Sequence, residues 1–314
     1  MVTLQEIEDA AKIIREGGLV AFPTETVYGL GADALNPTAV ARIFIEKERP
    51  SFDPLIVHIS STDYLSLLCK NVDENVQKLA EAFWPGPLTI VVPKNKIVPD
   101  IVTSGLPTVA VRMPANVIAL KLIEAANCPI AAPSANKFGR LSPTSAQHVR
   151  KQLPGVEHVL DGGSSAIGIE STVISVSPDG FEVLRHGSIT RQQIEMYVPF
   201  ALASKEEVLK QASPGFLKSH YSPNKPLYFS DSFSGDPARA GILSFSGKNM
   251  EGYKLVEVLS TNADLGEAAI NLFGALHRLE EAKIDYIVAE PVPEYGIGLA
   301  IMDRLRKAAY QYSH

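Results

Sequence analysis

Ala21-Phe22-Pro23-Thr24-Glu25-Thr26-Val27-Tyr28-Gly29-Leu30-Gly31 follows the apolar run Gly18-Leu19-Val20 in this chain. The apolar residues before Pro23 predict a buried strand. The strand ends in a turn dense with hydroxyl groups, and polar loops at strand ends commonly carry ligand contacts. Upstream, Thr3 and Glu6 have the spacing of a capping box, and Gly17-Gly18 ends the helix that leads into this strand.

Similar apolar runs recur along the first 200 residues and are interleaved with helical patterns. The predicted strands are 19–22, 55–59, 88–92, 108–112, 129–132, 156–160, 172–176 and 181–184. The predicted helices are 37–47 with Asn36 as N-cap, 73–83, 115–126 and 145–153. Because some strands follow one another without a helix between them, we predict a twisted, partly antiparallel sheet flanked by helices.

A second α/β unit is predicted after a charged segment and a Ser-Pro-Gly linker. Its pattern of strands and helices predicts a small, doubly wound, Rossmann-like domain. The strand candidates are 227–230, 241–245, 255–259 and 286–289, and the helices lie near 266–282 and 298–309. We therefore divide the chain into a catalytic-domain candidate at residues 1–200, a linker at 201–225 and a C-terminal domain at 226–314.

The composition excludes several classes of protein. A chain of 314 residues with 46% hydrophobic residues suits two folded domains. Its net charge of −6 argues against a protein that mainly coats nucleic acid. No apolar run approaches the roughly 20 residues of a membrane-spanning helix, and the first residues lack a signal-peptide pattern, so we expect a cytoplasmic location. Cys69 and Cys128 lack a zinc-site spacing and are expected to be buried, reduced thiols.

Two short polar motifs suggest a nucleotide site built without a phosphate loop. Lys47-Glu48-Arg49 ends an amphipathic segment, where both cations can neutralise phosphate charge. Ser134-Ala135-Asn136 adds a hydroxyl and an amide that can orient a nucleotide. Each motif alone is more often a solvated helix end or a turn.

Six ordered segments together resemble the YrdC-like family of L-threonylcarbamoyladenylate synthases: residues 21–31, 47–54, 84–89, 108–114, 131–136 and 168–172. Residues 213–223 are similar to the interdomain linker of the two-domain branch of that family. The resemblance implies synthesis of L-threonylcarbamoyladenylate and pyrophosphate from L-threonine, bicarbonate (or CO2) and ATP. The product serves N6-threonylcarbamoyladenosine formation in tRNAs that read codons starting with A. A separate tRNA threonylcarbamoyl transferase would receive this product. A weak contact between this protein and tRNA is kept as an alternative.

The resemblance assigns the L-threonine contacts to Thr26, His58, Arg112, Ala132 and Ser171. Arg112 ends a predicted strand, where a bidentate clamp on the threonine carboxylate would be well held. Judged only by its position in an apolar run, His58 would be a histidine at the edge of the core whose ring bonds to a nearby backbone group.

The resemblance assigns ATP contacts to Asp53, Thr108, Ser134, Asn136, Ser142 and Arg185, in addition to the two cations Lys47 and Arg49 of the first motif. The predicted ATP set is completed by three linker residues, His220, Tyr221 and Asn224, because their side chains can bond to or stack on a ligand. Within this set, Lys47, Arg49, Ser134 and Asn136 are the catalytic candidates. Asp53 departs from the neutral amide or imidazole that other members often carry, and phosphates would repel its carboxylate unless it faced a metal or the ribose. Judged only by its position at the end of a predicted strand, Arg185 is expected to form an exposed ion pair. Mg²⁺ is expected with ATP, held mainly by phosphate oxygens, and no protein metal ligand is assigned.

The linker is predicted to act as a mobile lid over the nucleotide at residues 213–224. His220, Tyr221 and Asn224 can bond to or stack on a ligand, which a passive spacer does not need. A closed lid would also protect the labile mixed anhydride from water. The alternative is that this segment merely docks the second domain.

Two other functions compete with the synthase. An RNA-binding module is disfavoured by the acidic net charge and by the lack of an RNP-type aromatic strand. A carbamoyladenylate-forming domain of the hydrogenase-maturation type would carry zinc-finger cysteines and an acylphosphatase segment, and this sequence shows neither.

Overall fold

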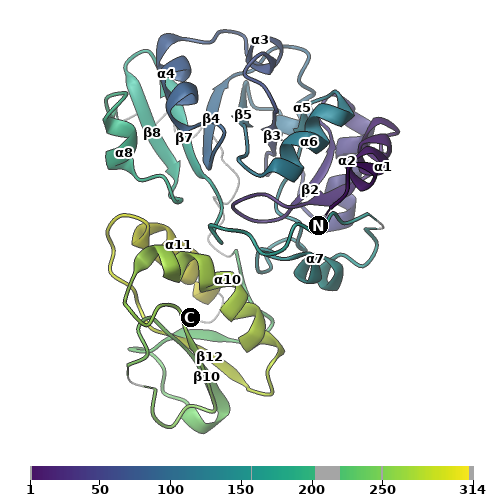
Figure 1. The fold of residues 1–314 in the computed structure, drawn as a ribbon. Helices are drawn as coiled ribbons and strands as arrows, with labels where there is room; N and C mark the ends of the chain where they lie inside the picture. The colour runs from purple at the N-terminus through teal and green to yellow at the C-terminus, as the bar shows by residue number, and fades with distance from the viewer. Residues whose placement is uncertain (1, 157, 202–219, 249, 311–314) are drawn as a thin grey trace.

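The computed structural model describes residues 2–156, 158–201, 220–248 and 250–310. These residues form two α/β domains that follow one another along the chain (Figure 1). The N-terminal domain is built on an eight-stranded mixed sheet and the C-terminal domain on a four-stranded parallel sheet. The predicted fold class is therefore confirmed.

The N-terminal sheet has the strand order β1-β2-β6-β3-β5-β4-β7-β8. Strand β3 runs parallel to β5 and strand β4 parallel to β7, whereas the other neighbours are antiparallel. The strands are β1 (Val20–Phe22), β2 (Gly29–Asp33), β3 (Ile56–His58), β4 (Leu88–Pro93), β5 (Thr108–Arg112), β6 (Ile130–Ala131), β7 (Thr172–Ser177) and β8 (Gly180–Arg185).

The helices of this domain begin where the sequence supplies capping side chains. Thr3 and Glu6 complete a capping box on α1, and Asn36 and Ser145 cap α2 and α7 with their side-chain oxygens. The helices are α1 (Leu4–Arg15), α2 (Pro37–Lys47), α3 (Tyr64–Leu68), α4 (Glu74–Phe83), α5 (Asp100–Thr103), α6 (Val117–Ala126), α7 (Ala146–Gln152) and α8 (Arg191–Glu195).

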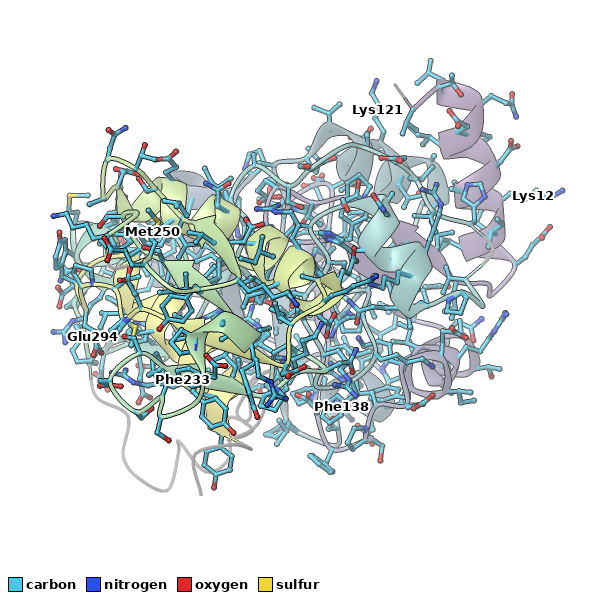
Figure 2. All side chains as sticks on the ribbon, turned by 90° about the horizontal axis from the view of Figure 1, so that it is seen from below. Lys12, Lys121, Phe138, Phe233, Met250 and Glu294 are labelled. Atoms are coloured by element: carbon cyan, nitrogen blue, oxygen red, sulfur yellow. The ribbon has the colours of Figure 1, made fainter. Side chains whose placement is uncertain are left out.

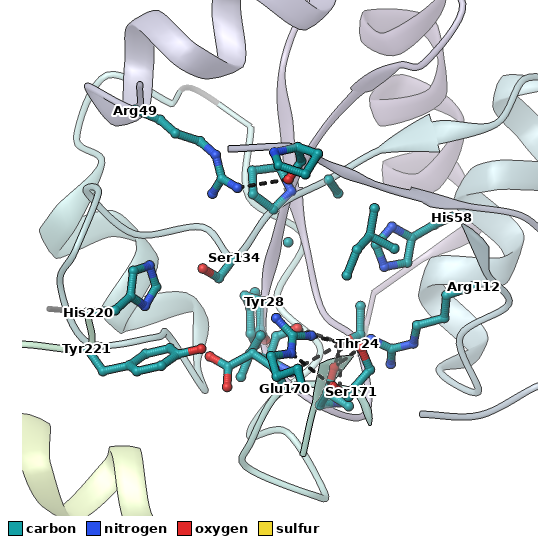
Figure 3. A pocket seen from close by; sticks show the side chains of 18 residues that line it. Thr24, Tyr28, Arg49, His58, Arg112, Ser134, Glu170, Ser171, His220 and Tyr221 are labelled. Carbon is teal, nitrogen blue, oxygen red and sulfur yellow. Dashed lines mark hydrogen bonds between the residues drawn. The ribbon is translucent and has the colours of Figure 1, made fainter. Parts of the chain in front are cut away.

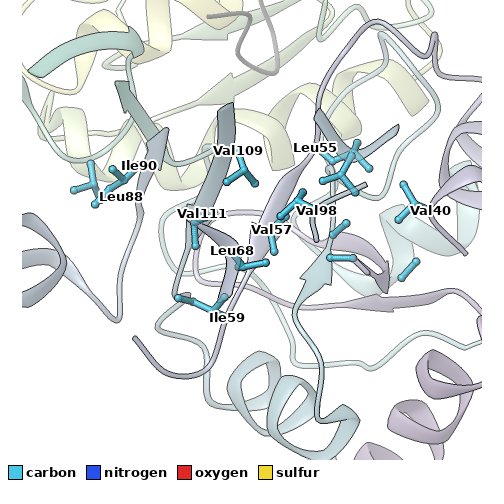
Figure 4. Packing of buried hydrophobic residues seen from close by; sticks show 14 of the residues in the cluster. Val40, Leu55, Val57, Ile59, Leu68, Leu88, Ile90, Val98, Val109 and Val111 are labelled. Carbon is cyan, nitrogen blue, oxygen red and sulfur yellow. The ribbon is translucent and has the colours of Figure 1, made fainter. Parts of the chain in front are cut away.

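Side chains of the central strands β3 and β5 alternate between a face that packs in the hydrophobic core and a face that carries polar residues. In β3 and β5, Val57, Val109 and Val111 belong to the main hydrophobic core, whose packing is shown in Figure 4. Because successive side chains of a strand point to opposite faces, His58 and Arg112 project from the other face. The register places His58 directly beside Arg112. Two polar residues on adjacent parallel strands thus meet on the face opposite this core.

Two local predictions differ from the structure. Residues 29–33 form strand β2, which the sequence analysis did not predict. Residues 156–160 were predicted as a strand, and this prediction was wrong: among the residues described there, only Val159 makes a β-bridge, with Ala21. The described residues of this segment form two backbone hydrogen bonds with Ala21. The Ala21 N–H donates to the carbonyl of His158, and the Leu160 N–H donates to the carbonyl of Ala21.

The C-terminal domain has the strand order β11-β10-β12-β9, all parallel. Its elements are β9 (Leu227–Phe229), the 3-10 helix η1 (Pro237–Arg239), β10 (Ala240–Ser244), β11 (Leu255–Val258), α10 (Leu265–Glu281), β12 (Tyr286–Ala289) and α11 (Gly298–Ala309). Figure 1 shows α10 and α11 between this sheet and the N-terminal domain. The expected doubly wound arrangement thus differs from the observed one, since both long helices of the described segment cover the same face.

The two domains share part of one hydrophobic core. Val27, Leu141 and Ile169 of the N-terminal domain belong to the cluster that contains the core of the C-terminal domain. Viewed from below, the C-terminal domain lies in front of part of the N-terminal domain (Figure 2). Within the described part of the chain, none of the helices has the length and apolar character needed to span a membrane.

Candidate active site

A cavity of about 50 Å³ gathers many of the predicted site residues. Side chains from the N-terminal sheet, from its loops and from the linker surround it, and Figure 3 shows Arg49, His58 and Tyr221 approaching from different sides. Its lining consists of Thr24, Thr26, Val27, Tyr28, Gly29, Arg49, Pro54, Ile56, His58, Arg112, Ala132, Pro133, Ser134, Glu170, Ser171, Arg185, His220 and Tyr221. Segments up to almost two hundred positions apart in the sequence therefore meet here.

All five predicted threonine contacts line this cavity. Arg112, at the end of β5, is buried, and its Nη1 donates a hydrogen bond to Thr26 Oγ1 at 2.9 Å. Its Nε donates to the carbonyl of Gly86 at 3.2 Å, and its Nη2 lies 2.6 Å from Glu25 Oε1. These contacts fix the plane of the guanidinium, which is the arrangement that a bidentate carboxylate clamp requires.

His58 is a neutral side chain beside this clamp. Burial, followed by the positive charge of Arg112, lowers the pKa of His58 to about 3. The ring packs edge-on against Phe22 with a centroid distance of 6.1 Å. A histidine with such a pKa stays uncharged at neutral pH and contributes shape and polarity rather than charge.

Ser171 and Arg185 form a second hydrogen-bonded unit of the wall. Arg185, at the end of β8, donates from Nε to the Ser171 carbonyl at 3.1 Å and from Nη2 to Ser171 Oγ at 3.0 Å. Ser171 Oγ also lies 2.7 Å from Thr89 Oγ1. Arg185 is buried, so the exposed strand-end ion pair expected from position alone is not what the structure places here.

The first polar motif is divided between the cavity and its outer wall. Helix α2 ends at Lys47, and Glu48 adopts a left-handed conformation with φ 54° that turns the chain toward Arg49. Arg49 lines the cavity and pairs with Asp53 at 2.9 Å. Lys47 lies behind this wall, where Nζ donates to the carbonyls of Ser134, at 2.6 Å, and Asn136. Burial, and then the charge of Arg49, lower the pKa of Lys47 well below its usual range.

Asp53 thus has a partner that the sequence did not suggest. Its carboxylate faces the guanidinium of Arg49, and the side chains of both residues are almost fully buried. A carboxylate that is neutralised in this way can lie near phosphate without repelling it strongly. Asp53 does not line the cavity itself.

The other predicted ATP residues occupy different positions. Ser134 lines the cavity, whereas the Asn136 amide donates to the carbonyls of Lys137 and Arg140 and holds the following loop. Thr108 lies at the start of β5, four positions from Arg112 and on the same face, but it does not line the cavity. The ATP contacts assigned to these residues, like the rest of the predicted site, remain predictions.

The linker contributes two residues of the predicted lid to the cavity. His220 and Tyr221 close one side of it, their rings meeting at a centroid distance of 4.2 Å. Burial, followed by the charges of Arg49 and Lys47, lowers the pKa of His220 well below its usual range. Asn224 lies elsewhere, in a separate pocket at the domain junction, and its backbone donates to Glu280. Residues 213–219 of the predicted lid are outside the described residues.

Ser142 reaches the cavity through Glu170. Its hydroxyl donates to Glu170 Oε1 at 2.5 Å, and Glu170 lines the cavity. The other carboxylate oxygen accepts a hydrogen bond from Arg304 Nε at 3.0 Å. Arg304 belongs to α11 of the C-terminal domain and lies 134 positions away. No pattern in the sequence singled out this arginine among the charged residues of an amphipathic helix.

Thr24 and Tyr28 also line the cavity, and no role was predicted for either. The Thr24 hydroxyl donates to the carbonyl of Val27 at 2.6 Å and shapes the turn that carries Thr26. The Tyr28 hydroxyl donates to the carbonyl of Gly163 at 2.6 Å, and burial raises its pKa to about 12. Their place in a hydroxyl-rich turn directly after a strand was the available signal.

The charges at the cavity suit an anionic ligand better than a metal cage. In the described lining, the guanidiniums are those of Arg49, Arg112 and Arg185. The carboxylate found in that lining, Glu170, is paired with another guanidinium, that of Arg304. Among the described residues, no three acidic, histidine or cysteine side chains gather in a metal-binding arrangement.

Comparisons with known proteins agree with this geometry. A family model described as "Telomere recombination" matches residues 12–187, and one described as "Threonylcarbamoyl-AMP synthase, C-terminal domain" matches residues 189–310. The chain is 46% identical to the threonylcarbamoyl-AMP synthase of Pyrococcus abyssi, covering 97% of this chain and 94% of that protein. It is 43% identical to the Bacillus subtilis threonylcarbamoyl-AMP synthase, covering 97% and 93%.

A solved structure, that of P. abyssi Sua5 complexed with L-threonine, superposes with a TM-score of 0.89 at 41% identity, covering 99% of this chain and 96% of that one. Both domains of the chain are thus accounted for by one architecture. The chain belongs to the two-domain Sua5 branch of the threonylcarbamoyl-AMP synthase family.

Proposed function

We propose that this protein synthesises L-threonylcarbamoyladenylate from L-threonine, bicarbonate (or CO2) and ATP, releasing pyrophosphate. The product supplies N6-threonylcarbamoyladenosine formation in tRNAs that read codons starting with A, through a separate tRNA threonylcarbamoyl transferase. The observation that carries this proposal is the buried Arg112 clamp in the same cavity as Arg49 and Arg185. An amino-acid carboxylate and a polyphosphate each require cations. This cavity offers Arg112 for the carboxylate and Arg49 and Arg185 for the polyphosphate.

The threonine half of the site is assigned to Arg112, Thr26, His58, Ser171 and the backbone of Ala132. Arg112 binds the carboxylate, since its guanidinium is already oriented by Thr26 and Gly86. His58 is uncharged and adjacent, so it adds no charge that competes with Arg112 for the carboxylate. The neighbouring hydroxyl of Ser171 offers a further hydrogen-bonding group.

The ATP half is assigned to Arg49, Arg185 and Ser134 in the cavity, with Lys47, Asn136, Thr108, Ser142 and Asp53 around it. The amine of threonine attacks the carbon of bicarbonate or CO2 to give a carbamate, with water leaving when bicarbonate is used. A carbamate oxygen then attacks the α-phosphorus of ATP, and the bond to pyrophosphate breaks. Such a step depends on alignment and on charge stabilisation rather than on a protein nucleophile. Arg49 and Arg185 supply the fixed positive charge.

Magnesium, when bound with ATP, would supply positive charge that neutralises the charge developing on pyrophosphate. The carboxylates of Glu25, Asp53 and Glu170 each face a guanidinium. The protein's part is to hold the phosphates through Arg49 and Arg185. Removal of magnesium should therefore weaken ATP binding without weakening threonine binding.

The linker acts as a lid in this proposal. Pockets for drug-sized ligands commonly measure about 300–1,000 Å³, far more than the space of about 50 Å³ observed here. We infer that part of the wall moves when ATP binds. His220 and Tyr221 belong to the linker rather than to the sheet, so they form the part of the wall that can move without unfolding the domain. Their return would exclude water from the labile adenylate.

A radiolabel experiment tests the function directly. Purified protein is incubated with labelled bicarbonate, ATP and magnesium, with and without L-threonine. We expect label to enter an acid-labile adenylate, with release of pyrophosphate, only when threonine is present. Serine should react more slowly, because loss of one methyl contact in a fitted pocket costs about 1 to 3 kcal/mol. Absence of a threonine-dependent labelled adenylate would refute the assignment.

A further inference from the structure

Arg304 is a fully buried arginine that crosses from the C-terminal domain to the wall of the active-site cavity. It lies on α11 and is 0% exposed. Its Nε donates to Glu170 Oε2 at 3.0 Å, and its Nη1 donates to the carbonyl of His186 at 2.6 Å. Both acceptors belong to the N-terminal domain. Asp303, on the same helix, lies 3.2 Å from Arg304 Nη1.

Among the described residues that line the cavity, Glu170 is the one that carries a carboxylate. Burial opposes its ionisation, but the charges of Arg304 and Arg185 and the hydrogen bond from Ser142 outweigh burial and hold its pKa below the usual range. The side chain is therefore an anion in the wall of a cavity whose ligand is also anionic. An uncompensated carboxylate at this position would repel phosphate strongly, because charges interact over longer distances in a poorly solvated site.

We propose that Arg304 is a positioning residue for the synthase reaction, through which the C-terminal domain neutralises Glu170 and keeps Arg185 oriented toward the ATP site. This inference rests on the proposed function, because it assumes that the cavity binds ATP. It gives the C-terminal domain a part in nucleotide binding that acts through Glu170 and Arg185.

The contacts of Arg185 explain why a second guanidinium is needed. Arg185 is held by two hydrogen bonds to Ser171, at 3.1 and 3.0 Å, and these keep it at the cavity wall. Without Arg304, Glu170 would be left with Arg185 as its nearest cation. The carboxylate would then compete with Ser171 and with phosphate for the same guanidinium. Arg304 removes that competition by occupying Glu170 Oε2.

Arg304 also contacts the linker. Its guanidinium carbon lies 5.6 Å from the ring centroid of Tyr221, within the range of a cation–π contact. The same ring packs against Phe273 of α10 at 5.6 Å. One arginine therefore touches the cavity wall and one of the two linker side chains that close the cavity.

The docking of the two domains is tight enough to hold Arg304 in place. Gly168, two positions before Glu170, approaches the backbone of α10 so closely that an added Cβ would lie 2.5 Å from the Ile270 carbonyl oxygen. The buried cluster at this junction contains Ile169 together with Leu305, the neighbours of Glu170 and Arg304. The ion pair thus lies between two packed segments.

A charge-deletion series in the full-length protein tests the proposal. The variants are Arg304→Met, Glu170→Gln and the double variant, with Arg306→Met as the matched control. Arg306 lies on the same helix but forms an exposed ion pair with Glu294. The readouts are the Kd of a non-hydrolysable ATP analogue with magnesium, the Kd of L-threonine, and the steady-state rate of adenylate formation.

We expect Arg304→Met to weaken binding of the ATP analogue by roughly tenfold to a hundredfold, the range for loss of a charge-assisted contact, and to change threonine affinity by less than about threefold. The double variant should recover most of the ATP affinity, because it lacks the unpaired carboxylate. Arg306→Met should match wild type in every readout. A purely structural role would instead weaken the single and double variants alike.

A pH profile gives a second, independent readout. Glu170 faces Arg304 of α11, Arg185 of β8, Ser142 of its loop and Tyr221 of the linker, with Asp303 beyond Arg304. In Arg304→Met, burial raises the pKa of Glu170 and favours the neutral form as the pH falls. The ratio of variant to wild-type Kd should therefore shrink between pH 7.5 and 5.5. In the Glu170→Gln background, the same ratio should stay flat.

Several results would overturn the inference. These are wild-type ATP affinity in Arg304→Met, equal loss in the single and double variants, or a ratio that does not change with pH. If Arg304→Met fails to fold, the double variant decides alone, since a Kd far weaker than that of Glu170→Gln contradicts the proposal. Failure of the proposed function is distinguishable, because wild-type protein would then form no labelled adenylate whatever the binding series shows.

Discussion

Replacement of Arg112 by methionine should separate the binding role of this residue from its structural role. Arg112 holds Thr26 at 2.9 Å and the Gly86 carbonyl at 3.2 Å, and it faces Glu25 at 2.6 Å. Loss of a hydrogen bond to a charged group costs about 1.5–3 kcal/mol. If that bond is made to the threonine carboxylate, the Kd for threonine should rise about tenfold to more than a hundredfold.

The same substitution leaves Glu25 without its cation. Breaking a buried ion pair on one side typically costs about 3–5 kcal/mol, and the side chain of Glu25 is still 11% exposed, so we expect a cost toward the lower end. The double variant Arg112→Met with Glu25→Gln removes both charges. It should regain much of the lost stability in urea unfolding and still bind threonine as poorly as the single variant.

Calorimetric titration with L-threonine and with an ATP analogue provides the assay. Arg49→Met is the matched control, because Arg49 lines the same cavity but is assigned to ATP. It should lose nucleotide affinity and keep threonine affinity, the reverse of Arg112→Met. If the double variant binds threonine like wild type, or if Arg112→Met loses ATP alone, the division of the site between the two ligands is wrong.

Three further outcomes are expected. Gly168→Ala should lower the urea midpoint and loosen domain docking. The φ of Gly168 is +79°, and an added Cβ would lie 2.5 Å from the Ile270 carbonyl oxygen, so both the backbone and the packing oppose a side chain. The control Gly105→Ala has the same φ but no atom within 4 Å of the added Cβ, so it should show only the backbone strain of about 1–3 kcal/mol. His148 and His277 stack across the domain junction at 3.8 Å, and burial lowers their pKa values to about 4 and about 3. In the unfolded chain both histidines bind protons near the ordinary histidine pKa of about 6.5. The free energy of unfolding should therefore fall as the pH drops from about 6.5 toward 4, by up to about 1.4 kcal/mol per pH unit for each histidine. In chemical denaturation, His148→Phe should make this dependence on pH less steep. His220→Ala and Tyr221→Ala should speed hydrolysis of the labelled adenylate, and wild-type retention of it in both variants would contradict the lid.

Local signals explain why much of the fold could be predicted. Asn36 and Ser145 cap helices through their own side chains, and such bonds depend only on residues a few positions away. The buried strands read as short apolar runs, as β5 does. The capping box of Thr3 and Glu6 likewise involves neighbours three positions apart. The family motifs were visible for a similar reason, since each is a contiguous segment.

The sequence by itself determined the identity of the ligand-facing motifs and the type of most elements. Tertiary structure alone decided which strands pair and which charges meet. Strand β2 contains Gly29 and Gly31, which local propensity disfavours in a strand. An added Cβ on Gly31 would lie 2.7 Å from side-chain atoms of both Phe22 and Ile130, so the packing of these distant side chains favours glycine there. The pairing of Glu170 with Arg304 links residues 134 positions apart. A buried charge is stable only with a partner, and no local pattern specifies which distant arginine packing will bring to it.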